Sequence, residues 1–321
     1  MTWSNFAACF RGSVKERDMN VFIIGASGYI GRAVTARVLN AGHRVTALVR
    51  SEASASRLPP GDVRVVAGSV EDVQALEKGL ETADAAIYLA IQGTQGASDA
   101  DRAALNAIVN HFRGTPRPLL VTSGLSVYVG TPEPFVDEST PLDTAPPSQT
   151  WRVALEQELL ATGAHVVIIR PPMVYGQGTA GPVLQTALRH AREHREALVA
   201  GAGANLVPVV HVEDLAAAYV LALTKAPAGT VLNVAATSVT GHDLGRAISY
   251  AAGLQGEIVV RTPADVVAAL GPLGGPFIMD LRLSNFQVTH LLGWTPSASS
   301  LLYELLYGTL KSTEDGDPGA R

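Results

Sequence analysis

The chain has 321 residues, of which 47% are hydrophobic and 17% charged, so a packed globular core is expected rather than disorder. The net charge of −5 without a basic stripe argues against a nucleic-acid partner, and no apolar run approaches the ~18 residues of a membrane span. The single cysteine, Cys9, excludes an internal disulfide framework and favours a reducing, cytoplasmic location.

Strand-like apolar runs alternate with amphipathic segments of helical length from residue 20 to about 235. The predicted strands are residues 20–24, 44–49, 63–66, 85–90, 119–122 and 165–169. The predicted helices between them are residues 29–41, 73–80, 101–112 and 151–161. This alternation predicts an α/β fold with a Rossmann-type, doubly wound parallel sheet.

A glycine-rich turn, GASGYIG at residues 25–31, separates the first predicted strand from the first predicted helix. Gly25 would permit the tight turn, Gly28 would let the backbone approach a pyrophosphate, and Gly31 would let helix and strand pack closely. The start of the helix offers N–H donors and a partial positive charge to phosphates. This strand–turn–helix context predicts that the turn binds NAD(P).

The end of the second strand selects between the two forms of the cofactor. NAD sites place an Asp or Glu about 20 residues beyond the turn to hold the ribose hydroxyls. Here the strand ends at Arg50, and Arg32 directly follows the third glycine. A guanidinium can pair bidentately with a 2′-phosphate, so we predict NADP(H). Glu52 lies nearby and leaves NAD as an alternative.

Five longer segments and one short one resemble a known superfamily. They are GASGYIG (25–31), DAAIYLA (84–90), VTSGLSVY (121–128), RPPMVYGQG (170–178), VVHVEDLAAAYVLAL (209–223) and LGWTP (292–296). In this order and spacing they resemble the extended or atypical short-chain dehydrogenase/reductase superfamily, in its NAD-dependent epimerase/dehydratase branch. The resemblance implies a Rossmann domain followed by a substrate lobe.

The resemblance also implies positions for the rest of the cofactor. Ser69 and Val70 would lie near the adenine, although Ser69 stands where relatives have an Asp. The residues predicted to bind the cofactor are Gly25, Ser27, Gly28, Tyr29, Ile30, Gly31, Arg32, Arg50, Ser69, Val70, Leu89, Ala90, Thr122, Arg152, Pro171 and Val174.

The catalytic residues that the resemblance implies are only partly present. Relatives use a Tyr hydroxyl, a Lys four residues later that lowers the Tyr pKa, and a Ser or Thr that binds the substrate oxygen. Aligned on Glu156, the expected region has Ser148 at the Tyr position and Arg152 at the Lys position. Gly124 stands at the usual Ser/Thr position, between Ser123 and Ser126.

Three interpretations stay open. Another hydroxyl could serve, with Tyr128 or Tyr175 nearest in the sequence. Ser123 or Ser126 could polarise a carbonyl group without a strong acid. The chain could also bind the cofactor without turning it over. The predicted catalytic residues are therefore Ser123, Ser126, Tyr128 and Arg152. The scattered histidines predict no metal site.

We expect an NADP(H)-dependent oxidoreductase that acts on a carbonyl or secondary alcohol of a small molecule, such as a sugar nucleotide, steroid-like compound or secondary metabolite. One alternative is a catalytically degenerate regulatory or sensor protein. Another is an epimerase, dehydratase or isomerase with no net redox change. The expected partners are a small-molecule substrate and a second copy in a homodimer, with no nucleic acid and no membrane.

The predicted division of the chain follows these motifs. Residues 1–18 form an N-terminal extension, residues 19–175 the Rossmann domain, residues 176–311 a mixed α/β substrate lobe with segments returning to the sheet, and residues 312–321 a disordered tail. Pro171 and Pro172 end the sixth strand. Residues 131–150, rich in Pro, Ser, Thr and acids, are predicted to be a long surface loop.

Overall fold

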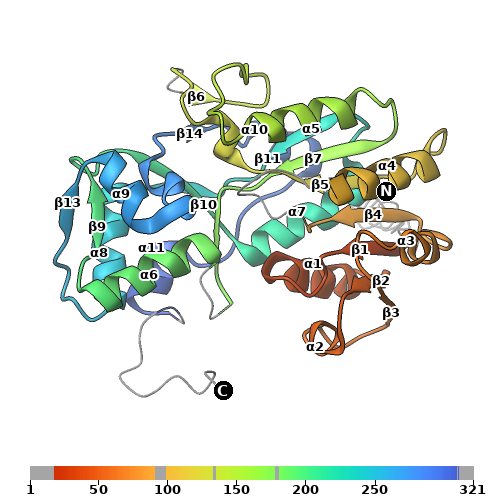
Figure 1. The fold of residues 1–321 in the computed structure, drawn as a ribbon, viewed down its shortest axis with the longest axis horizontal. Helices are drawn as coiled ribbons and strands as arrows, with labels where there is room; N and C mark the ends of the chain where they lie inside the picture. The colour runs from red at the N-terminus through yellow and green to blue at the C-terminus, as the bar shows by residue number, and fades with distance from the viewer. Residues whose placement is uncertain (1–17, 91–98, 133–134, 178–180, 309, 311–321) are drawn as a thin grey trace, which may run out of the picture.

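The computed structural model describes residues 18–90, 99–132, 135–177, 181–308 and 310. Residues 1–17 of the predicted extension and the predicted tail 312–321 lie outside the described residues, as does Gly178 of the fourth motif. Figure 1 shows two parts side by side, a large sheet covered by helices and a smaller lobe built around α6, α8, α9 and α11.

The large sheet has seven parallel strands. They are β1 (Asn20–Ile24), β2 (Arg44–Val49), β3 (Val63–Ala67), β4 (Ala85–Tyr88), β5 (Leu119–Thr122), β7 (Val166–Arg170) and β11 (Thr230–Asn233). Their order, β11-β7-β5-β4-β1-β2-β3, places β1 between β2 and β4. This confirms the predicted doubly wound α/β fold. β4 ends two residues earlier than predicted, and β7 ends before Pro171, which has no backbone N–H for the ladder.

Helices cover both faces of this sheet because successive strand side chains point to opposite sides. Val21 and Ile23 of β1 face α1 (Tyr29–Asn40), α7 (Val212–Lys225) and α10 (Phe286–Leu292). Phe22 and Ile24 face α3 (Val73–Leu80), α4 (Asp99–Phe112) and α5 (Thr150–Leu160). A short helix, α2 (Glu52–Ala55), follows β2.

The smaller lobe has its own sheets and core. β8 (Met173–Tyr175) pairs in parallel with β10 (Leu206–His211), and β12 (Thr237–Thr240) pairs antiparallel with β10. β9 (Leu198–Ala200) pairs with β13 (Val259–Arg261). Around them lie α6 (Pro182–His194), α8 (Gly241–Ala251), α9 (Pro263–Leu270), α11 (Leu301–Leu306) and the 3-10 turns η3 (Gly271–Leu273) and η4 (Gly275–Ile278). β8 lies before residue 176 but belongs to the smaller lobe. α7, β11 and α10 lie after residue 176 but pack with the large sheet. The chain therefore crosses between the two parts more than once.

The segment 131–150 contains one element that the sequence did not predict. A two-residue strand, β6 (Phe135–Val136), pairs with β14 (Arg282–Leu283), although the rest of the described segment is irregular. Val136 is buried while Phe135 is exposed. The pairing fixes the segment to a stretch of chain nearly 150 residues further on, which no local pattern could indicate.

Asp214, in the first turn of α7, attaches the C-terminal segment to the Rossmann part. Its carboxylate accepts hydrogen bonds from the backbone N–H groups of Ser297 (2.9 Å) and Ala298 (3.1 Å). The indole N–H of the buried Trp294 donates to the Asp214 carbonyl at 2.8 Å. Asp214 therefore has a structural role at the start of α7.

Candidate functional site

The glycine turn brings the start of α1 against the ends of β1 and β4. Gly25 adopts φ +90°, a conformation that L side chains rarely adopt. A Cβ atom on Gly31 would lie 2.0 Å from the Gly25 carbonyl oxygen, so only glycine fits there. No side chain caps the N-terminus of α1 at Gly28. These N–H groups are therefore available to an anionic group such as a pyrophosphate.

A first cavity of about 610 Å³ opens beside this turn, at the carboxyl ends of β1 to β4. Its lining residues are Ile24, Gly25, Ser27, Gly28, Leu48, Val49, Arg50, Ser54, Arg57, Gly68, Ser69, Val70, Glu71, Leu89, Ala90, Ala100 and Asp101. This is the switch point of the sheet, where doubly wound folds hold dinucleotides. The glycine cradle and the cavity fit the adenosine half of such a cofactor.

Two arginines reach this cavity. Arg50 follows β2, as predicted, and Arg57 follows α2. Arg57 donates to the Ser54 hydroxyl at 3.3 Å, and Ser54 is held in turn by Ser51 at the start of α2. Both arginines are exposed, so an anion at this end of the cavity would meet two hydrated cations.

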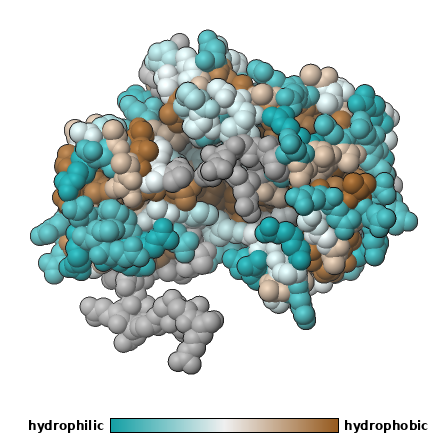
Figure 2. All heavy atoms as spheres, viewed as in Figure 1, coloured by the Kyte–Doolittle hydropathy of each residue, from teal (hydrophilic) through white to brown (hydrophobic). Residues whose placement is uncertain are grey.

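A second cavity of about 320 Å³ lies between the sheet and the smaller lobe. Its lining residues are Tyr29, Ile30, Leu89, Thr122, Ser123, Gly124, Leu125, Ser126, Arg152, Pro171, Pro172, Met173, Val174, Gly181, Pro182, Val183, Val207, Pro208, Leu273, Pro276 and Met279. Leu89 lines both cavities, so they meet at the end of β4. In Figure 2 the surface is hollowed between the two parts of the molecule, with hydrophobic residues inside the hollow.

Hydroxyl groups of the segment after β5 line this second cavity. Ser123 donates to the Glu156 carboxylate, and Ser126 donates to the Gln149 side-chain oxygen at 2.8 Å. The Thr122 hydroxyl lies 2.6 Å from the hydroxyl of the fully buried Tyr219. Because both serine protons are donated away from the cavity, the serine oxygens present lone pairs to it.

Arg152 supplies a buried positive charge at the same place. It is 8% exposed, and its guanidinium lies 4.6 Å from the centre of the Trp151 ring. Its Nε donates to the Gln149 side-chain oxygen at 3.2 Å, the same atom that accepts from Ser126. Burial lowers the pKa of Arg152 below its ordinary value, and the nearby Glu156 carboxylate opposes this shift. Arginine starts from so high a pKa that it stays charged at neutral pH.

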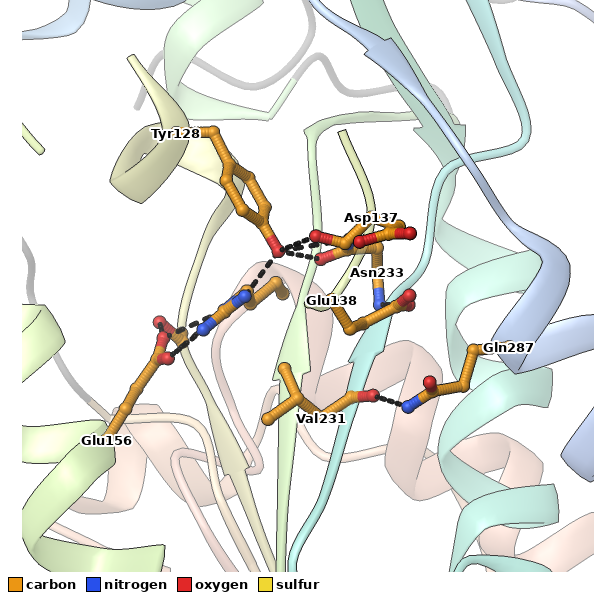
Figure 3. A network of polar contacts seen from close by, with 9 residues as sticks. Tyr128, Asp137, Glu138, Glu156, Val231, Asn233 and Gln287 are labelled. Atoms are coloured by element: carbon orange, nitrogen blue, oxygen red, sulfur yellow. Dashed lines mark hydrogen bonds and ion pairs between the residues drawn. The ribbon is translucent and has the colours of Figure 1, made fainter. Parts of the chain in front are cut away.

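A buried network lies behind Ser123 and holds Glu156 in place (Figure 3). Arg170 Nε donates to both Glu156 oxygens, at 3.1 and 3.2 Å, and a second guanidinium nitrogen donates to the Tyr128 hydroxyl. Burial would lower the pKa of Arg170, but the hydrogen bonds and charge of Glu156 raise it overall. The Tyr128 hydroxyl also lies 3.2 Å from the Asn233 side chain, and both groups point toward each other in the figure.

The two tyrosines considered as acids lie outside the residues that line the second cavity. Tyr128 is 1% exposed, and burial raises its pKa. Tyr175 is 2% exposed, burial raises its pKa to about 12, and its hydroxyl donates to the Ser299 carbonyl at 2.8 Å. A buried phenol that is hard to ionise and already engaged is a poor proton relay, so we leave both out of the proposed mechanism.

Most of the other predicted residues come together at the two cavities. Arg32 and Gly31 line neither cavity; Gly31 serves the helix–strand packing instead. The sequence did not single out Arg57 or Gln149, nor did it assign Tyr219 a partner. Arg57 lies seven residues beyond Arg50, so a search for basic residues over the whole loop after β2 would have found it.

Among the residues that the structure describes, no group of three or more His, Cys, Asp or Glu side chains could hold a metal ion. Within the same residues, none of the helices has the length and apolar character needed to cross a membrane.

Comparison with known proteins decides the family. The model of the NAD dependent epimerase/dehydratase family matches residues 21–235. The chain belongs to this family. The matched stretch runs from β1 to just beyond β11, so it contains the glycine turn and Arg152. Membership in this family of NAD-dependent enzymes supports an enzymatic role.

Relatives that match nearly the whole chain include an uncharacterized protein and a reductase. An uncharacterized protein of Schizosaccharomyces pombe is 30% identical over 299 residues, covering 89% of this chain and 98% of that protein. A 3-diazoavenalumate denitrifying reductase of a Streptomyces species is 25% identical over 316 residues, covering 88% of this chain and 97% of the reductase.

Solved structures of the epimerase type share the fold. The UDP-N-acetylglucosamine 4-epimerase of Methanobrevibacter ruminantium, in complex with UDP-N-acetylmuramic acid, superposes with a TM-score of 0.73 at 18% identity, covering 92% of this chain and 98% of the epimerase. MoeE5 in complex with UDP-glucose and NAD gives a TM-score of 0.70 at 21% identity, covering 90% and 97%. At these identities the likeness shows the fold alone.

Proposed function

We propose that the chain is an NADP(H)-dependent oxidoreductase that moves a hydride between the nicotinamide and the carbonyl or secondary alcohol carbon of a small organic molecule. The observation that carries this proposal is Arg152, a buried cation that lines the second cavity beside Ser123 and Ser126. The cavity joins the glycine cradle through Leu89. A dinucleotide lying along both cavities would present its nicotinamide beside this charge.

The first cavity would hold the adenosine half. The uncapped start of α1 suits the pyrophosphate, and Arg50 and Arg57 suit a 2′-phosphate. These two cations favour NADP(H) over NAD. The other proposed cofactor residues are Ser27, Tyr29, Ile30, Ser69, Val70, Leu89, Ala90, Thr122, Pro171 and Val174.

The bound nicotinamide supplies or accepts the hydride. In the direction of reduction, the carbonyl carbon gains the hydride and the carbonyl electron pair moves to the oxygen. Arg152 would stabilise the negative charge that develops there, because a preorganised cation is effective where charge forms in the transition state. Since arginine does not give up its proton, the oxygen takes its proton from solvent water. In the direction of oxidation, Ser123 or Ser126 would accept the hydroxyl proton of an alcohol substrate in a hydrogen bond, because their own protons are donated elsewhere.

Reductases among the relatives support a redox reaction. Besides the Streptomyces reductase, a ketoreductase of Stigmatella aurantiaca, named for a 3-oxo dihydroquinoline oxide, is 27% identical over 227 residues, covering 66% of this chain and 67% of that enzyme. Both names describe reduction of small organic molecules. We also retain a cytoplasmic location and a homodimer as predictions.

The experiment is steady-state NADPH oxidation over a panel of small carbonyl compounds, with Arg152→Met and Arg152→Lys beside the wild type. Loss of the cation should lower kcat by about 100-fold or more, the usual cost of an oxyanion-stabilising group. Arg152→Lys keeps a charge and should stay within about tenfold of the wild type. Arg37→Met, an exposed arginine of α1 outside both cavities, is the matched control.

Two results would contradict the proposal. One is a wild-type kcat in Arg152→Met. The other is tight NADPH binding without turnover of any compound, which would favour a sensor. Product masses separate the epimerase or dehydratase alternative, because reduction adds two hydrogens and an isomerisation adds none.

A further inference from the structure

The wall of the second cavity that faces the substrate is apolar. The smaller lobe and its connections contribute Val183, Val207, Leu273, Pro276 and Met279. Val207 is 1% exposed in the lobe core, and Met279 is 7% exposed in a cluster with Leu125 and Tyr128, so both side chains are packed rather than free to move aside. The polar side chains of the lining come from other elements: Tyr29 of α1, Thr122 of β5, Ser123 and Ser126 after it, and Arg152 of α5.

Charge is nearly absent from this cavity. Among the described residues that line it, Arg152 is the one charged side chain. A nucleoside diphosphate carries at least two negative charges, and its burial requires paired cations or several N–H donors. Arg152 is already needed at the reacting oxygen.

The volume of the second cavity also argues against a nucleoside diphosphate. At about 320 Å³ the cavity is near the lower end of small-molecule sites, and the nicotinamide must share it. The space that remains suits a compact molecule with one polar oxygen near Arg152 and a hydrocarbon body against the apolar wall.

We infer that the substrate is a neutral, apolar carbonyl compound, an alkyl or aryl ketone or aldehyde, and not a nucleotide sugar. This inference rests on the proposed function, since it assigns the substrate of the same site. It separates this chain from the solved epimerases of the same fold that were crystallised with UDP-linked sugars.

The test titrates the full chain, saturated with NADP⁺, with 2-alkanones of increasing length and with UDP-glucose. Isothermal titration reads binding, and NADPH oxidation with the same compounds reads turnover. Each added methylene that enters the apolar wall should tighten binding by about fourfold. UDP-glucose should bind at least about 100-fold more weakly than the longest alkanone that fits.

Variants test whether the dependence of binding on chain length comes from the apolar wall. Val183→Lys, at a partly exposed position, should abolish the chain-length dependence, while Val183→Ala should only weaken it. Val73→Lys, on the exposed side of α3 and 62% exposed, is the control. Far-UV circular dichroism and the melting temperature of each variant should match those of the wild type, which shows that they fold.

Tight binding of UDP-glucose, or alkanone binding that ignores chain length, would overturn the inference. Chain-length-dependent binding without turnover would support the inference while contradicting the proposed hydride transfer. The two claims can therefore fail separately.

Discussion

Arg152 differs from the lysine whose place it takes in both charge and shape. Its guanidinium is planar and permanently charged, and here it is stacked on Trp151 and held by Gln149. A lysine of the usual kind lowers the pKa of a nearby tyrosine, but here Ser148 stands at the tyrosine position and Tyr128 is engaged behind the site. Tyr29 lines the cavity, but its hydroxyl donates to the Gly176 carbonyl at 3.0 Å. Stabilisation of charge, rather than transfer of a proton, is the chemistry that this residue offers.

The proposed preference for NADPH over NADH depends on two side chains, Arg50 and Arg57, and can be tested by replacing each of them. Each should contribute a charge-assisted contact to a 2′-phosphate, so Arg50→Ala and Arg57→Ala should each weaken NADPH binding by roughly 10- to 100-fold. Binding of NADH, which lacks that phosphate, should change by less than about threefold. Fluorescence titration measures both, with Arg37→Ala as the control. Equal losses for the two coenzymes would show that the arginines do not read the phosphate.

Glu138 gives a pH-dependent stability. Burial raises its pKa above the ordinary 4.5, although its carboxylate accepts the Asn233 backbone N–H at 2.7 Å. The folded state therefore holds this proton more tightly than the unfolded state. The stability that it contributes is present below pH 4.5 and is lost as the pH rises through the folded pKa.

Glu138→Gln should keep the acceptor and remove the partly buried charge. The variant should melt at a higher temperature than the wild type at pH 8, and the difference should shrink toward zero as the pH falls to about 4. Thermal denaturation over this range measures it. Glu77→Gln, an exposed glutamate of α3, should show no such trend. A difference that grows on acidification would mean that the shift has the opposite sign.

At the scale of elements, the junction of β1 and α1 depends on one missing side chain. An added Cβ at Gly31 would meet the backbone of the turn itself, so α1 would have to move away from the cradle. Gly31→Ala should lower the free energy of unfolding by about 2 to 3 kcal/mol or more. It should also weaken NADPH binding by at least about tenfold.

The matched control for this junction is Gly275→Ala, because nothing lies within 4 Å of an added Cβ there. Chemical denaturation and NADPH titration report the two effects. A Gly31→Ala variant with wild-type stability would show that helix and turn are not packed as closely as described.

Local patterns sufficed for the elements that carry the cofactor. Short apolar runs between amphipathic segments predicted the strands. Arg50 could be recognised because it directly follows one of these strands, whose end was clear in the sequence. Contacts between residues far apart in the sequence could not be predicted in this way. Gln149 meets Ser126, and Tyr219 meets Thr122 from almost 100 residues away. Such partners depend on how helices pack on the sheet, which a single sequence does not specify.

At the scale of the whole molecule, the large sheet supplies the cofactor cradle and the smaller lobe supplies the apolar wall. The two cavities meet at Leu89, so the reacting carbon of a substrate in the second would face a nicotinamide extending from the first. Catalysis would then depend on both parts being held together, and Asp214 links them through the segment at Ser297 and Ala298. The arrangement predicts direct hydride transfer within one site.

Transfer of deuterium from NADPH that carries deuterium at both hydrogen positions of the nicotinamide C4 tests this most directly. With a 2-alkanone as substrate, mass spectrometry should find one deuterium on the carbinol carbon of the alcohol product, which gains two hydrogens in all. The same label should stay on the coenzyme in Arg152→Met, where transfer is slow. A product formed without deuterium, or one with the mass of the substrate, would contradict hydride transfer by this site.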